Sequence, residues 1–178
     1  MKKALVGLGL AGLLFFTPAI PTYAQHSPAE QTTLEYKIEK TFPNKPIQDI
    51  EDFRQYSDDI IKIVAEKMHI KLDEKIPKPK IITEKEMTLD EYNRRAYEFS
   101  KKAGYPLTKP LEAMCSTYFV EENEILISED RKLHTLAHEL VHYLQIKYRQ
   151  DDPLNDPYDN LEREAIYIQL EFKDKYLK

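Results

Sequence analysis

Two histidines and a glutamate in the C-terminal half of the chain have the types and spacing of a metal site. His138 and His142 are four residues apart, so on a helix their imidazoles lie on one face about one turn apart, as two zinc ligands require. Glu139 directly follows the first histidine, where its carboxylate can take a proton from a metal-activated water without binding the metal itself. The pattern predicts a Zn²⁺ site that carries out hydrolysis.

The residues around this pattern predict a buried helix. Apart from Glu139, no charged residue lies between Thr135 and Leu144, although 32% of the chain is charged. A buried helix that holds two histidines and a carboxylate needs partners for these polar groups, and a metal ion supplies them. We therefore prefer a zinc site to a chance occurrence of the pattern.

A third ligand is expected from a second helix near the C-terminus, where two acidic residues compete. Glu162 and Glu164 are two positions apart, so on a helix they point roughly 200° apart and only one can face the metal. The predicted inward stripe of this helix consists of Leu161, Ala165, Ile168 and Phe172. Glu162 borders that stripe and Glu164 stands further off it, towards solvent. Glu162 is therefore the predicted ligand, and Glu164→Ala is expected to cost little.

These features resemble the zincin superfamily of metallopeptidases, and within it the gluzincin branch. In that branch a glutamate on a second helix completes the metal site, and Glu162 follows His142 by 20 residues, at the spacing common there. Ala165 stands where the branch has a small residue, and the apolar hairpin ahead of the metal helix looks like the zincin sheet. The resemblance covers about Leu111 to Ile168. The sequence departs from the family at Ile166, where several gluzincin families have an aspartate.

The resemblance implies a fold and an activity. The expected fold class is α/β (α+β), a zincin-like small twisted sheet with a β-hairpin, a metal helix and a C-terminal helix bearing the glutamate. The expected activity is zinc-dependent hydrolysis of peptide bonds in a peptide or protein substrate, with Glu139 as the base. The transition-state donor is left open among four residues, Tyr158, Tyr167, Tyr118 and His134. The alternative is a secreted binding or inhibitory protein on a zincin scaffold, with structural zinc or lost catalysis.

Hydrophobic spacing and turn residues predict the elements that must hold this site. Helices are expected over 47–68, from the capping box at Thr88 to about Ala103, from Ser128 to about Arg149, and from about Leu161 to Tyr176. A short strand is expected over 80–83, and a hairpin over 111–128 with a polar turn at 121–124. The loop 151–160 contains two prolines and connects the last two helices.

Composition excludes several other function classes. Gly104 is the only glycine after residue 12, so no phosphate-binding loop, dinucleotide turn or nucleophile elbow can be built. The acidic, mixed charge is poorly suited to nucleic acid. Cys115 is the single cysteine, so no intrachain disulfide is possible, and its apolar surroundings predict a buried structural thiol.

The N-terminus has the pattern of a secretory signal peptide. Lys2 and Lys3 precede the apolar run 4–16, prolines break it, and Thr22-Tyr23-Ala24 offers a cleavage site. Residues 1–24 are therefore predicted to be removed, which moves the formal charge from −5 to −7 because they carry two lysines and no acid. The remaining 25–178 form one predicted domain, secreted or periplasmic and without a membrane span, in which 25–46 form a flexible arm.

Export gives the first testable prediction. The mature protein outside the cytoplasm should begin at Gln25, because cleavage follows the small residue Ala24. Mass spectrometry of the N-terminal peptide of the exported protein measures this. Exported protein that keeps the segment 1–24 would contradict the prediction.

Overall fold

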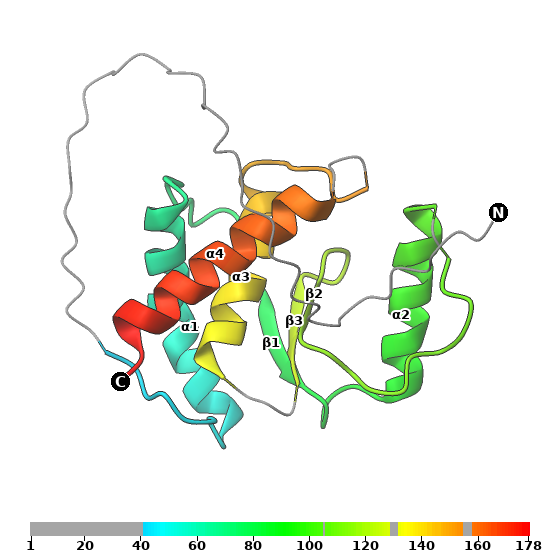
Figure 1. The fold of residues 1–178 in the computed structure, drawn as a ribbon, viewed down its shortest axis with the longest axis horizontal. Helices are drawn as coiled ribbons and strands as arrows, with labels where there is room; N and C mark the ends of the chain where they lie inside the picture. Colours follow the sequence, from blue (N-terminus) through cyan, green and yellow to red (C-terminus); the bar gives the residue numbers. More distant parts are fainter. Residues whose placement is uncertain (1–40, 105, 129–131, 155–157) are drawn as a thin grey trace, which may run out of the picture. The chain divides into compact units, whose positions relative to one another are not determined.

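The computed structural model describes residues 41–104, 106–128, 132–154 and 158–178 (Figure 1). The predicted signal peptide 1–24 and most of the predicted arm 25–46 lie outside these residues. The elements follow in the order α1 (Ile50–Lys67), β1 (Lys80–Thr83), α2 (Leu89–Lys102), β2 (Thr117–Phe119), β3 (Glu124–Ile127), α3 (Leu133–Lys147) and α4 (Tyr158–Tyr176). In the described part of the chain the fold is therefore mixed α and β, with four helices and a three-stranded sheet, as the coarse fold class predicted. No helix in that part is long and apolar enough to cross a bilayer.

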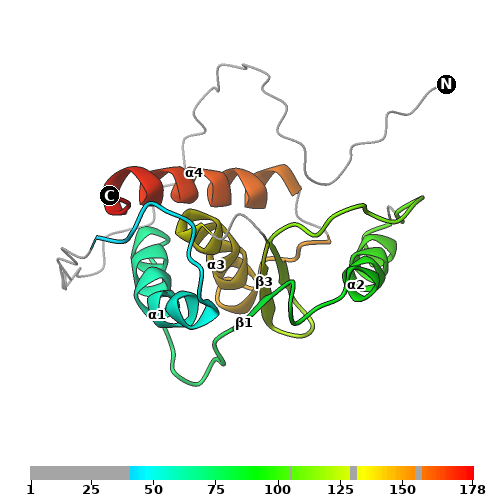
Figure 2. The same ribbon diagram turned by 90° about the horizontal axis from the view of Figure 1, so that it is seen from below.

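The sheet has the strand order β1-β3-β2. β1 is parallel to β3 and β2 is antiparallel to β3, so β2 and β3 form a hairpin with β2 at an edge. Leu126 of the central strand packs with Ile82, Phe119 and Tyr92 of α2 in one apolar cluster. α1 and α3 contact the strands from the other side (Figure 2).

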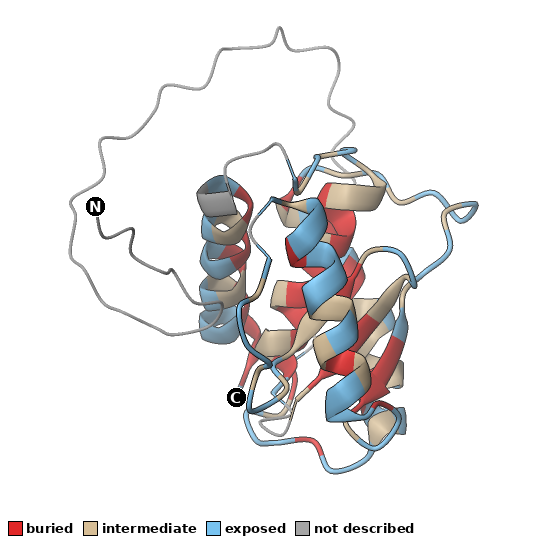
Figure 3. Cartoon of the chain, turned by 90° about the vertical axis from the view of Figure 1, so that its right-hand side faces the viewer, coloured by how far each residue is buried: buried red, intermediate tan, exposed pale blue. Residues whose placement is uncertain are grey.

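α3 lies between the sheet and α4, and this placement buries most of it. Nine of its fifteen residues are buried, including Glu139 and Gln145. α4 packs along α3 and also contacts α1. Its buried residues are Leu161, Ala165, Ile168, Phe172 and Tyr176, which include the whole predicted stripe. Burial is accordingly concentrated on the strands and on the helix faces that meet them (Figure 3).

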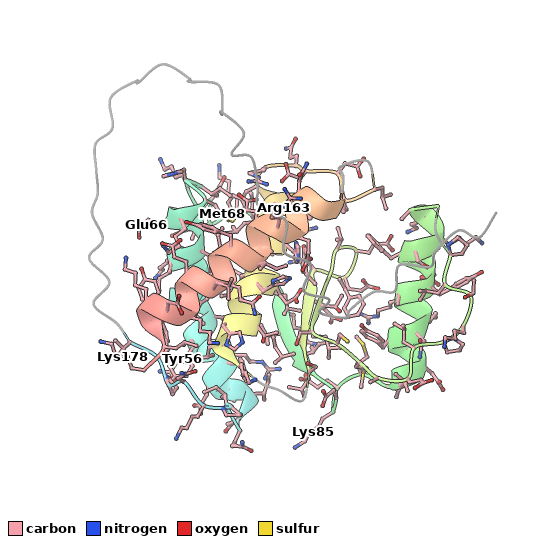
Figure 4. The ribbon with its side chains drawn as sticks, in the orientation of Figure 1. Tyr56, Glu66, Met68, Lys85, Arg163 and Lys178 are labelled. Carbon is pink, nitrogen blue, oxygen red and sulfur yellow. The ribbon has the colours of Figure 1, made fainter. Side chains whose placement is uncertain are left out.

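The end of the predicted arm packs against the C-terminus. The Phe42 backbone N–H donates to the Tyr176 carbonyl at 2.8 Å, and the Lys178 N–H donates back to the Phe42 carbonyl at 3.0 Å. The Phe42 ring is 2% exposed and contacts the rings of Tyr56 and Phe172. Tyr56 and Lys178, which both contact Phe42, lie at the same end of α4 (Figure 4). Residues 42–44, which belong to the stretch predicted as an arm, are therefore bound to the C-terminal end of the chain.

Several local predictions are confirmed. β1 spans the predicted residues 80–83, and α1 and α4 fall within three residues of their expected ends. The Thr88 hydroxyl accepts a hydrogen bond from the Glu91 N–H at 3.2 Å, as a capping residue does. Gly104 follows α2 with φ at +79°, the left-handed conformation that glycine adopts without strain.

Two local predictions are wrong. α3 begins at Leu133 without a side-chain cap, whereas the helix was expected to begin at Ser128. The Ser128 hydroxyl instead lies 3.0 Å from the Ser116 hydroxyl, across the base of the hairpin. Cys115 is exposed and not buried, because the strand expected from Leu111 begins only at Thr117 and Cys115 lies outside the sheet.

The packing of Phe42 gives a stability prediction. Phe42→Ala should lower the free energy of unfolding by about 3–5 kcal/mol, because it leaves a cavity among buried rings. The same substitution at Phe99, which is 40% exposed, should cost much less. Urea denaturation of both variants measures the difference, and equal losses would show that the 41–44 segment does not contribute to the core.

Candidate metal centre

The packing of α4 along α3 brings three potential ligand residues together. His138 and His142 come from the sheet-packed helix α3, and Glu162 comes from the first turns of α4. The Nε2 atoms of the two histidines are 3.1 Å apart. Glu162 Oε1 is 3.3 Å from His138 Nε2, and Glu162 Oε2 is 3.3 Å from His142 Nε2. The three residues predicted from the sequence therefore form one cluster.

These separations fit a tetrahedral zinc ion. Donors about 2.0–2.1 Å from such an ion lie roughly 3.3–3.4 Å from one another, close to the separations seen here. Two imidazoles and a carboxylate are also a donor set that zinc accepts. Among the described residues, no fourth histidine, cysteine or carboxylate joins the cluster. The three side chains are 14–29% exposed, so the centre is reachable from solvent.

Two buried or half-buried glutamines orient the histidines. Gln145 Oε1 lies 2.9 Å from His142 Nδ1, and Gln169 Oε1 lies 3.1 Å from His138 Nδ1. An amide oxygen at Nδ1 accepts a hydrogen bond from the N–H of that nitrogen, which leaves Nε2 as the atom that faces the cluster. Amides here take the part that carboxylates often have behind metal-binding histidines.

Glu139 is buried next to the cluster without belonging to it. Its side chain is on the sheet side of α3, where the Tyr118 backbone N–H donates to its carboxylate. Burial raises the pKa of Glu139, and the nearby His142 and His138 only partly oppose that rise. A carboxylate of raised pKa holds a proton more readily, which suits a group that accepts and releases one.

The electrostatics of the cluster favour positive charge between the ligands. Burial would raise the pKa of Glu162, but hydrogen bonds from His138 and His142 outweigh it and hold that pKa well below its usual value. Burial likewise would lower the pKa of His142, but Glu162 and Glu139 raise it overall. A pocket that stabilises a proton shared by these groups also stabilises a cation in its place.

The candidate transition-state donors are scattered. The Tyr118 hydroxyl donates to Asn123 Oδ1 at 2.9 Å, within the hairpin. Tyr167 is 67% exposed on α4. His134 lines a hollow with Pro43 and Leu177, next to the C-terminus. The side chain of Tyr158 lies outside the described residues. Tyr118 is thus near the site through its backbone N–H and not through its hydroxyl.

Gln145 and Gln169 were not predicted from the sequence. Gln145 lies three residues after His142, so it shares a helix face with that histidine. Gln169 lies seven residues after Glu162, which also places the two on one face of α4. These spacings can be seen in the sequence, but they predict contacts with the histidines only once α3 and α4 are known to pack together.

Comparison with known proteins adds no relative. No protein-family model matches the chain, and no curated protein or solved structure matches it.

Metal content gives the next prediction. Protein purified without chelator should contain one zinc per chain by elemental analysis, and His142→Ala should contain none, because two ligands hold zinc weakly. His69→Asn is the matched control, since His69 is exposed and asparagine tolerates its φ of 55°. Full zinc in His142→Ala would place the metal elsewhere.

Proposed function

We propose that the mature chain is an exported zinc-dependent hydrolase of the zincin type, acting on peptide bonds. The observation that carries the proposal is the arrangement of four side chains. His138, His142 and Glu162 present donor atoms 3.1–3.3 Å apart, and the carboxylate of Glu139 is buried beside them without joining them. Three protein ligands and an adjacent base are what metal-assisted hydrolysis needs.

Each residue has a role in this proposal. Zinc, when bound, would polarise the substrate carbonyl and make water acidic enough to be deprotonated near neutral pH. His138, His142 and Glu162 hold the ion. Glu139 takes the proton of the attacking water and passes it to the leaving amine. The Tyr118 N–H holds the Glu139 carboxylate in place during both transfers.

Strand β2 supports a peptide as the substrate. It is an edge strand of the sheet, and no other described strand pairs with its second edge. Tyr118 of this strand contacts Glu139, so the edge adjoins the base. An extended peptide can add to such an edge through backbone hydrogen bonds to groups other than the Tyr118 N–H, which Glu139 binds, and this brings its own amide bonds near the metal.

The alternative of a binding or inhibitory protein with structural zinc predicts a closed metal site. A structural zinc ion has four protein ligands, whereas a catalytic one leaves a position for water. The described residues supply three ligands, which supports the enzyme.

Glu139→Gln tests the proposal directly. The variant should keep its zinc but lose about 10²- to 10⁴-fold in hydrolytic rate, because an amide cannot accept the proton of water. Proteomic identification of cleavage sites, followed by rate measurements on the peptides found, compares it with wild type. Glu112→Gln, at an exposed position, is the control. Undiminished hydrolysis in Glu139→Gln would remove Glu139 as the base, and absence of any cleavage by the zinc-loaded wild type would favour the binding protein.

A further inference from the structure

We propose that Glu164 and Arg149 are positioning residues of the metal centre, which act through Gln145 to fix the tautomer of His142. None of these residues belongs to the ligand cluster. The inference deepens the proposed function and rests on it for the role of the metal. It also revises the expectation that Glu164 faces solvent and can be replaced at little cost.

The orientation of the Gln145 amide is determined by its surroundings. Gln145 is fully buried, and its Nε2 donates to the Leu161 carbonyl at 3.0 Å and to Glu164 Oε2 at 2.9 Å. Both of these partners can only accept. A reversed amide would set its oxygen against two acceptors and leave buried hydrogen-bonding groups unsatisfied, which is costly. The oxygen of Gln145 must therefore face His142.

This orientation determines where His142 carries its proton. The Gln145 oxygen lies 2.9 Å from His142 Nδ1 and can only accept, so Nδ1 must donate. With the N–H fixed on Nδ1, the proton that Nε2 shares with Glu162 is the one that a metal ion replaces, and the Nε2 lone pair then serves the metal. Nε2 is the atom that faces His138 Nε2 and Glu162 Oε2. The amide thus keeps His142 in the form that binds a metal.

Glu164 is itself held by a charged partner. Arg149 donates to Glu164 Oε1 at 2.8 Å and also binds Asp151, so the carboxylate is fixed with Oε2 directed at Gln145. The ion pair lies at the surface, with side-chain exposures of 35% and 31%. A hydrogen-bonded chain therefore runs from the surface through Arg149, Glu164 and Gln145 to His142.

Nuclear magnetic resonance of the metal-free protein tests the chain without requiring catalysis. Long-range ¹⁵N–¹H correlation at alkaline pH, where the imidazole is neutral, shows which nitrogen of His142 carries the proton. Wild type should show the Nδ1–H form. Glu164→Ala should raise the fraction of the Nε2–H form, whereas Glu164→Gln, which keeps an oxygen acceptor for Gln145, should stay near wild type. Arg149→Ala should shift the tautomer in the same direction by less, and provides a surface variant if Glu164→Ala folds poorly.

Zinc affinity, measured by chelator competition, is the second readout. Glu164→Ala should weaken binding about tenfold, at the low end of the effect of groups behind metal ligands, because the Leu161 carbonyl still holds Gln145. Glu171→Ala is the matched control: Glu171 lies on the same helix as Glu164, but its ion pair is with Lys67 of α1 and not with Gln145, so its loss should change neither readout. Wild-type tautomer and affinity in Glu164→Ala would overturn the inference. A wild-type protein that binds no zinc would instead refute the proposed function, and the tautomer would still decide the inference.

Discussion

The candidate metal centre depends on the contact between α3 and α4. α3 carries both histidines but no third ligand, so the cluster exists only because α4 presents Glu162 against them. The two helices run in opposite directions, since Gln145 meets Leu161 while His138 meets Gln169. Ala165 is fully buried on α4, and its small side chain lets the two helices approach closely enough for the Glu162 carboxylate to reach both imidazoles. A larger side chain there would separate the three potential ligands.

The same contact places polar groups where water is scarce, and this is unfavourable unless each finds a partner. Gln145 is fully buried and satisfied on all sides by His142, Leu161 and Glu164. Glu139 is buried with a backbone N–H as its donor. Such networks fix orientation because any rotation of one member leaves another unpaired. The buried polar groups of this small domain therefore fix the orientation of the site's side chains, in addition to the stability that its apolar core provides.

The sheet supports the site from the other side of α3. Tyr118 offers its N–H to Glu139, while its ring contacts the ring of Tyr143 and its hydroxyl binds the hairpin turn at Asn123. Asn123 and Tyr143 in turn hold the Pro77 carbonyl ahead of β1. Glu139 and the potential ligands thus rest on different partners: Glu139 on the hairpin, and the histidines on α3 and α4. A change in one support need not disturb the other.

The sequence by itself determined the local features of this protein. Helix geometry relates residues that are only a few positions apart, so neighbouring side chains are enough to predict it. It accounts for the four-residue spacing of His138 and His142, the capping threonine of α2 and the apolar stripe of α4. The stripe was also enough to favour Glu162 over Glu164.

Only the tertiary structure decided the rest. α3 begins later than predicted because Ser128 bonds across the hairpin. Cys115 is exposed because it lies outside the sheet. Gln145, Gln169 and Glu164 acquired roles because they meet residues 16 to 31 positions away, and which distant residues meet is set by how whole helices pack.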